Sequence, residues 1–171
     1  ILVSGGGKQS FFNLALATLN KGDEAIIPAP YWVSYPDMVL VAEGKPVIIE
    51  TSADTRFKIT PEQLESAITE RTRLFVINSP SNPSGMAYSL DELKAIGEVL
   101  KKHPQIMIAT DDMYEPILWT GQPFCNILNA SPKAHPTRPR FPRRPQRQRW
   151  MALRTACRKW SRRSRNVTTT W

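Results

Sequence analysis

The sequence predicts an α/β fold: a three-layer domain in which a mostly parallel sheet has helices on both faces. Over the first 130 residues, short apolar runs of strand length alternate with segments of helix length. Two pairs of residues, Thr60 with Gln63 and Ser89 with Glu92, have the spacing of capping boxes that begin helices. No apolar run is long enough to span a membrane.

The first five elements follow from apolar runs and from the residues that end them. Glycine commonly ends a helix, and proline ends a central strand. We therefore predict, in chain order, a strand end at 1–3, a helix at 9–20 stopped by Gly22, a strand at 24–28, a helix at 34–44 ending at Gly44, and a strand at 46–50.

The remaining elements begin with the two capping boxes. Thr60 followed by Pro61 predicts a helix over 61–69, since proline suits the first helical turn. The apolar run at 73–77 is a buried strand, Ser89 starts a helix that reaches about residue 102, and 105–109 is the next strand. Because such sheets bind ligands beyond the carboxyl ends of their strands, the loops at 4–8, 28–36, 78–85 and 110–115 are the places to look for a site.

Charge divides the chain into two unlike parts. The net charge of +8 is the sum of −5 over residues 1–132, which hold all 15 acidic residues, and +13 over residues 133–171. We predict a folded domain over 1–131 and a basic tail over 132–171. Limited proteolysis should remove the tail quickly and leave the domain intact. The chain starts at Ile1, inside a predicted strand, so we expect it to be a piece of a longer protein.

The tail has two competing interpretations. Prolines at 136, 139, 142 and 145 suit a polyproline II segment and exclude a helix there. A composition of proline, arginine, serine and tryptophan without acids is typical of GC-rich coding DNA translated out of frame, and we prefer a frameshift after about Ser131. The alternative is a genuine tail that binds nucleic acid through thirteen positive charges and interleaved aromatic rings.

The stretch Ser4-Gly5-Gly6-Gly7-Lys8-Gln9 is the first candidate site. It is not a nucleotide-binding P-loop, because Leu2 stands where the first glycine is required and Gln9 follows the lysine. A single phosphate at the helix start fits the glycines, and a plain strand-to-helix turn is the structural alternative.

Three other loops carry polar or aromatic residues at strand ends. Trp32 is either a core ring or a platform for a flat ligand. Asn82 lies in a turn after a buried strand, where ligands collect. Asp111 and Asp112 follow the last predicted strand with Tyr114 close behind, and an aspartate there either caps a helix or binds a positive partner. The cysteines 125 and 157 and the histidines 103 and 135 have no metal-site spacing.

Taken together, these loops resemble one family. The motifs SGGGKQ, PAPYWVSYP, NSPSNPSG and TDDMYE occur in the order and rough spacing of fold-type I pyridoxal-phosphate aminotransferases, nearest to bacterial aspartate aminotransferases of class I. The resemblance covers about residues 1–130. It implies that this segment is part of the large, cofactor-binding domain of a two-domain α/β enzyme that forms homodimers in the cytoplasm.

The resemblance also implies roles for single residues. Seven residues would contact pyridoxal 5′-phosphate: Gly7, Lys8, Gln9, Trp32, Asn82, Asp111 and Tyr114. Backbone amides of the first three would hold the phosphate, and Trp32 would stack on the ring. Asp111, rather than Asp112, would pair with the protonated ring nitrogen, which keeps the ring an electron sink. Asn82 and Tyr114 would bond the ring oxygen, and Trp32 and Asn82 would contact the substrate.

The lysine that forms the Schiff base with the cofactor is not found. In the family it lies in a Ser-Lys motif followed by Gly-Trp-Arg, downstream of the Asp…Tyr loop, where this sequence has the basic tail. Lys8 is therefore not that lysine, and Lys133 is only a weak candidate. The resemblance implies amino transfer between an aspartate-like amino acid and a 2-oxo acid, with this chain alone inactive. The competing function is a basic-tailed protein that binds nucleic acid, or a non-catalytic remnant.

Overall fold

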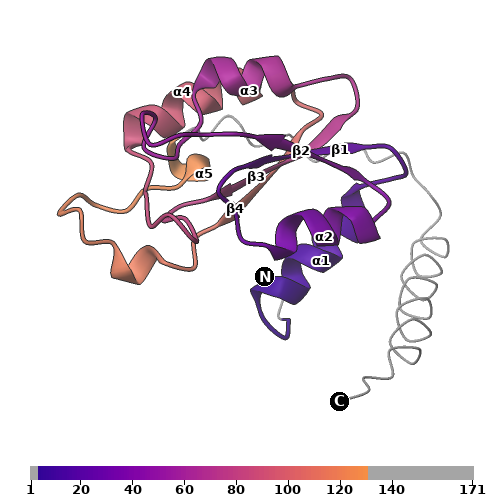
Figure 1. The fold of residues 1–171 in the computed structure, drawn as a ribbon, viewed down its shortest axis with the longest axis horizontal. Helices are drawn as coiled ribbons and strands as arrows, with labels where there is room; N and C mark the ends of the chain where they lie inside the picture. The colour runs from indigo at the N-terminus through magenta and orange to yellow at the C-terminus, as the bar shows by residue number, and fades with distance from the viewer. Residues whose placement is uncertain (1–3, 131–171) are drawn as a thin grey trace. The chain divides into compact units, whose positions relative to one another are not determined.

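The computed structural model describes residues 4–130, and these form a four-stranded sheet between two helical layers (Figure 1). The strands are β1 (Glu24–Pro28), β2 (Lys45–Ile49), β3 (Thr72–Asn78) and β4 (Met107–Asp111). The helices are α1 (Gly7–Thr18), α2 (Ser34–Val41), α3 (Pro61–Ala67), α4 (Leu90–Lys101), the 3₁₀ turn η1 (Glu115–Ile117) and α5 (Ile127–Ala130). The predicted strand end at 1–3, Lys133 and the basic tail lie outside the described residues.

The sheet order is β2-β1-β3-β4, and all three pairings are parallel. The chain leaves β1 toward β2 on one side, then returns past β1 to β3 on the other. Because parallel crossovers are right-handed, connections that run in opposite directions place their helices on opposite faces. Figure 1 shows α1 and α2 on one face and α3 and α4 on the other, which confirms the predicted α/β class.

Each face of the sheet buries its own core because successive strand residues point to opposite sides. Ile26, Phe75 and Ile77 pack among residues of α3, α4 and α5. Their neighbours Ile27 and Val76 pack instead among residues of α1 and α2. Since β1 and β3 are buried on both faces, their sequences are continuous apolar runs rather than alternating ones.

Both predicted capping boxes are present. The backbone N–H of Gln63 donates to the Thr60 hydroxyl at 3.2 Å, and its side-chain oxygen accepts from the Thr60 N–H at 2.9 Å. Ser89 and Glu92 repeat the arrangement at 3.3 and 2.7 Å. Each cap satisfies N–H groups that have no partner within the helix, an effect of about 1 kcal/mol.

Three predicted helix ends were wrong, and α1 also begins two residues earlier than predicted, at Gly7. α3 ends at Ala67 rather than at residue 69. α1 ends at Thr18, and Gly22 lies in the following turn, with φ 83° and its N–H bonded to the Glu43 carbonyl at 3.1 Å. α2 ends at Val41, and Glu43, not Gly44, adopts positive φ (64°). Gly44 is required for another reason: an added Cβ would lie 3.1 to 3.2 Å from Leu19, Asp23 and Val39.

The last strand lies two residues later than predicted. β4 pairs with β3 from Leu74↔Met107 to Asn78↔Asp111, so the strand continues through Asp111. Sequence periodicity missed this extension because Thr110 and Asp111 are polar and their strand conformation comes from pairing with β3. Asp111 is therefore the last residue of β4 rather than a loop residue. No helix among residues 4–130 is long and apolar enough to cross a membrane.

Candidate functional site

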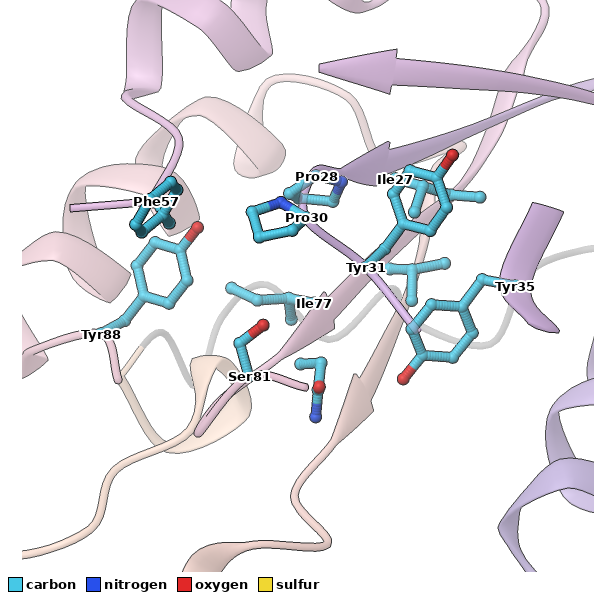
Figure 2. Close-up of a pocket in the computed structure, with 11 residues that line it drawn as sticks. Ile27, Pro28, Pro30, Tyr31, Tyr35, Phe57, Ile77, Ser81 and Tyr88 are labelled. Atoms are coloured by element: carbon cyan, nitrogen blue, oxygen red, sulfur yellow. The ribbon is translucent and has the colours of Figure 1, made fainter. Parts of the chain in front are cut away.

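The predicted site residues gather where β1, β3 and β4 end. The chain leaves β1 and β3 in opposite directions, so their carboxyl ends form the switch point at which open α/β sheets bind ligands. Figure 2 shows a pocket at this point, with Pro30, Tyr31 and Tyr35 after β1 and Ser81 and Tyr88 after β3. The cavity measures about 20 Å³, room for one water molecule.

The glycine loop gives α1 an N-terminus that no side chain caps. Gly6 precedes the helix with φ 116°, a conformation that suits glycine, and it makes no side-chain cap bond. The Gln9 side chain turns back instead and accepts from the Gly5 N–H at 2.6 Å. Residues 7–9 are exposed, and the first turn contains no acidic residue. These amides therefore have the arrangement that binds an anion at a helix start.

Trp32 is half-buried and lies between a cation and an aromatic ring. The Lys8 ammonium lies 4.9 Å from the centre of the indole, within the range of a cation–π contact. Tyr35 meets the indole edge to face, with ring centres 5.4 Å apart. Trp32 is thus neither a fully buried core residue nor a free platform, and Lys8 joins the glycine loop to the loop after β1.

Tyr35 and Asp111 form a short polar contact across the site. The Tyr35 hydroxyl donates to Asp111 Oδ2 at 2.5 Å, and Asp111 Oδ1 accepts the Met113 N–H at 3.3 Å. Burial, and next the hydrogen bond and charge of Asp111, raise the pKa of Tyr35 well above its usual value. The hydroxyl therefore stays protonated and holds the carboxylate in one orientation.

Asp112 points elsewhere, as expected for the next residue in an extended segment. Its carboxylate accepts from the Asn126 side chain at 2.9 Å and contacts the Thr110 hydroxyl at 2.5 Å. Neither aspartate caps the following 3₁₀ turn, whose first position has no side-chain cap. Of the two aspartates, only Asp111 thus has its carboxylate bonded to α2, through Tyr35.

Asn82 and Tyr114 come from different loops and meet. The Asn82 Nδ2 lies 3.5 Å from the Tyr114 hydroxyl, and both side chains are half-buried. The backbone N–H of Asn82 donates to the Asn78 side chain at 2.7 Å, and Asn78 in turn donates to the Asp111 carbonyl at 2.8 Å. A chain of contacts therefore connects Lys8, through Trp32 and Asp111, to Tyr114.

Two residues of this chain of contacts were not predicted. Tyr35 had a usable signal, since a buried tyrosine needs a partner for its hydroxyl. Asn78 had one as well, because it is the polar residue that closes the apolar strand β3. Neither signal identified the shared partner, Asp111. Asp111 lies on β4, and its position beside β3 depends on the strand order of the folded sheet.

The donors and acceptors fit a phosphorylated, flat, protonated heterocycle. Uncapped amides at Gly7–Gln9 suit its phosphate, Trp32 suits the ring, and the Asp111 carboxyl suits a ring N–H. The Asn82–Tyr114 pair suits a ring oxygen. Contacts connect five of the predicted residues, Lys8, Trp32, Asp111, Asn82 and Tyr114. Gly7 and Gln9 flank Lys8 in the first turn of α1 and make no contact with the other four. The roles of all seven toward a cofactor stay predictions.

Comparison with known proteins gives concordant results. A sequence model described as "Aminotransferase class I and II" matches residues 1–138. The chain is 71% identical over 132 residues to the aspartate/prephenate aminotransferase of Nitrosomonas europaea, covering 77% of this chain and 33% of that protein. It is 55% identical over the same length to the aspartate/prephenate aminotransferase of Cereibacter sphaeroides.

Solved structures agree with these relatives. The aspartate aminotransferase of Rhizobium meliloti matches with a TM-score of 0.75 and 48% identity, over 77% of this chain and 33% of that one. The Thermus thermophilus aspartate aminotransferase with maleate gives 0.70 and 42%, over 74% and 33%. The chain therefore spans about a third of the length of the proteins it matches.

Proposed function

Because the chain belongs to the class I and II aminotransferases, we propose that it is part of the large domain of a pyridoxal-phosphate-dependent enzyme that transfers an amino group from an aspartate-like amino acid to a 2-oxo acid. The observation that carries this proposal is the connected set of contacts from Lys8 to Tyr114 at the ends of β1, β3 and β4. The activity is proposed for the whole protein, of which this chain holds the cofactor-facing loops.

Each residue has a distinct task in this proposal. When bound, the cofactor supplies an electron sink for negative charge that develops on the substrate carbon. Asp111 holds a proton on the ring nitrogen, and Tyr35 keeps that carboxylate oriented by occupying Oδ2. Trp32 orients the ring, and the amides of residues 7–9 bind the phosphate.

Asn82 and Tyr114 would complete the proposed set by holding a ring oxygen of the cofactor. Their polar groups lie 3.5 Å apart, so one ring oxygen can accept hydrogen bonds from both. The Asn82 amide would also donate to a substrate carboxylate. Relatives named aspartate/prephenate aminotransferases make aspartate and prephenate the first pair of substrates to test. A cytoplasmic homodimer is the proposed working form.

The test uses a full-length enzyme that carries residues 4–130 of this chain. With pyridoxal phosphate it should show the cofactor's visible absorbance and should convert aspartate with a 2-oxo acid acceptor. Absence of both the absorbance and the turnover would contradict the proposal.

The 171-residue chain by itself serves as the comparison. It contains no Ser-Lys motif followed by Gly-Trp-Arg, so borohydride treatment with the cofactor should label no single lysine stoichiometrically. Stoichiometric labelling of one lysine, found by peptide mass spectrometry, would show that the chain holds its own covalent anchor. Lys133 would then be the first residue to examine and Lys8 the second.

A further inference from the structure

Asn78 makes two side-chain hydrogen bonds at the end of β3. Its Nδ2 donates to the backbone carbonyl of Asp111 at 2.8 Å, and its Oδ1 accepts the backbone N–H of Asn82 at 2.7 Å. The first partner can only accept and the second can only donate, so one orientation of the amide satisfies both. Both bonds therefore require a side chain of the shape of asparagine, with its donor toward Asp111 and its acceptor toward Asn82.

These two bonds connect the residues that would contact the cofactor ring at different atoms. Asp111 ends β4, and Asn82 lies in the loop after β3, so no bond of the β3–β4 ladder reaches Asn82. The Asp111 carbonyl also accepts the Ser79 N–H at 3.3 Å, which fixes the strand ends but not the loop. Asn78 is the direct connection between the end of β4 and the backbone of Asn82.

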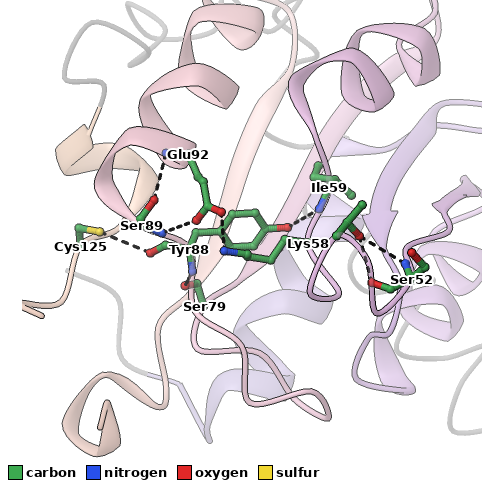
Figure 3. A network of polar contacts seen from close by, with 9 residues as sticks. Ser52, Lys58, Ile59, Ser79, Tyr88, Ser89, Glu92 and Cys125 are labelled. Atoms are coloured by element: carbon green, nitrogen blue, oxygen red, sulfur yellow. Dashed lines mark hydrogen bonds and ion pairs between the residues drawn. The ribbon is translucent and has the colours of Figure 1, made fainter. Parts of the chain in front are cut away.

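The loop over residues 79–88 is held in place by other bonds. The Ser79 hydroxyl accepts the Tyr88 N–H at 3.1 Å, and the Tyr88 hydroxyl accepts the Ile59 N–H at 3.0 Å. Figure 3 shows this anchor, with the ion pair of Lys58 and Glu92 beside the Tyr88 ring. The loop therefore remains attached without Asn78, and what Asn78 adds is the position of Asn82 relative to Asp111.

We propose that Asn78 is a positioning residue for the amino-transfer reaction: its amide fixes the spacing between Asp111 and Asn82, and so aligns the groups at the two sides of the cofactor ring. This inference rests on the proposed function. Asn78 itself touches neither reacting atoms nor cofactor in this proposal. A misplacement of about 1 Å at such groups costs up to about 100-fold in rate.

Three substitutions separate this role from general support of the loop. Asn78→Ala removes both bonds. Asn78→Asp keeps the acceptor for the Asn82 N–H but sets an ionised oxygen against the Asp111 carbonyl. When the introduced carboxyl is protonated, it again offers one donor and one acceptor. The matched control, Ser79→Ala, removes the bond at the base of the loop and leaves both Asn78 bonds intact.

The first measurement needs no cofactor. Hydrogen exchange at the Asn82 amide, measured by NMR on the 171-residue chain, should be about tenfold faster in Asn78→Ala, because its acceptor is lost. Ser79→Ala should leave that amide at its original rate and speed the Tyr88 amide instead. If the Asn82 amide exchanges at the same rate in Asn78→Ala and in the unchanged chain, Asn78 does not connect Asp111 to Asn82 and the inference is overturned.

The second measurement uses the full-length enzyme carrying these residues. Asn78→Ala should lower kcat by about 10- to 100-fold, against less than about threefold for Ser79→Ala. The Asp111 carbonyl disfavours the ionised form of the introduced carboxyl and raises its pKa above the usual value of about 3.9. The activity of Asn78→Asp relative to the unchanged enzyme should therefore rise as the pH falls from about 8 to about 5, since protonation restores the donor. Equal losses in Asn78→Ala and Ser79→Ala, or a flat pH ratio, would overturn the positioning role. If the unchanged enzyme neither binds the cofactor nor turns over, the proposed function fails and the positioning role fails with it. The exchange measurement then still tests whether Asn78 connects Asp111 to Asn82.

Discussion

Removing the Tyr35 hydroxyl tests the contact on which the site depends most. The ring is 2% exposed and packs 4.9 Å from Phe11 and 5.4 Å from Trp32, contacts that Tyr35→Phe retains. The substitution deletes only the donor to Asp111 at 2.5 Å. A hydrogen bond to a charged group contributes about 1.5–3 kcal/mol to stability. Asp111 is half-buried and keeps the Met113 N–H, so we expect a loss near the lower limit, about 1.5 kcal/mol.

Urea unfolding of the 171-residue chain, followed by circular dichroism, measures this loss. With a denaturant slope of about 1–3 kcal/mol per molar, the midpoint should fall by about 0.5–1.5 M while the slope stays constant. A double-mutant cycle with Asp111→Ala assigns the effect to the pair. If Tyr35→Phe costs as much in the Asp111→Ala background as in the unchanged chain, the hydroxyl acts through some other group and the reasoning is refuted.

Three further predictions concern the aspartates, the core and the pH dependence. In the full-length enzyme, Asp111→Ala should lower kcat at least about 100-fold, whereas Asp112→Ala, whose contacts are Asn126 and Thr110, should change kcat far less; comparable losses would contradict the assignment. Leu64→Ala should destabilise the chain by about 2–5 kcal/mol in urea unfolding, and the exposed Leu40→Ala by less than about 0.5 kcal/mol, since their exposed fractions are 0% and 57%. Burial raises the pKa of Tyr88 to about 12, so its contribution to stability is complete below pH ~10 and is lost as the pH rises toward 12; unfolding at pH 9 to 12 should show a shallower decline for Tyr88→Phe, and an unchanged decline would count against this.

The layers of the fold were predictable because they depend on local patterns. Strand β1, for example, is an uninterrupted apolar run because both of its faces are covered, and its predicted bounds match the structure. Thr60 and Ser89 identified two helix starts because capping joins residues only three positions apart. Gly44 misled the prediction of the helix end. A glycine is favoured there because Leu19 and Asp23 lie too close for a Cβ atom, and no local sequence pattern contains those contacts.

The positions of the candidate residues at strand ends were predictable, but their connections were not. Trp32 and Asn82 follow β1 and β3, and Asp111 ends β4, at the edge of a parallel sheet where ligands bind. The partners Tyr35 and Asn78 could not be assigned from sequence, because each bonds to Asp111 on β4 from another element. Tyr35 lies in α2 and Asn78 ends β3, and only the folded sheet brings these elements beside β4. The two-residue shift of β4 has the same origin, since pairing with β3 extends the strand to Asp111.

The central place of β1 in the sheet has a consequence for synthesis on the ribosome. β1 pairs with β2 soon after it emerges, because Lys45 follows Glu24 by 21 residues. Its other neighbour, β3, begins at Thr72, 48 residues after Glu24. At about 5–20 residues per second, the second edge of β1 waits roughly 2 to 10 seconds for its partner. During that interval one edge of an apolar strand lacks its partner in the sheet and is open to pairing with another chain.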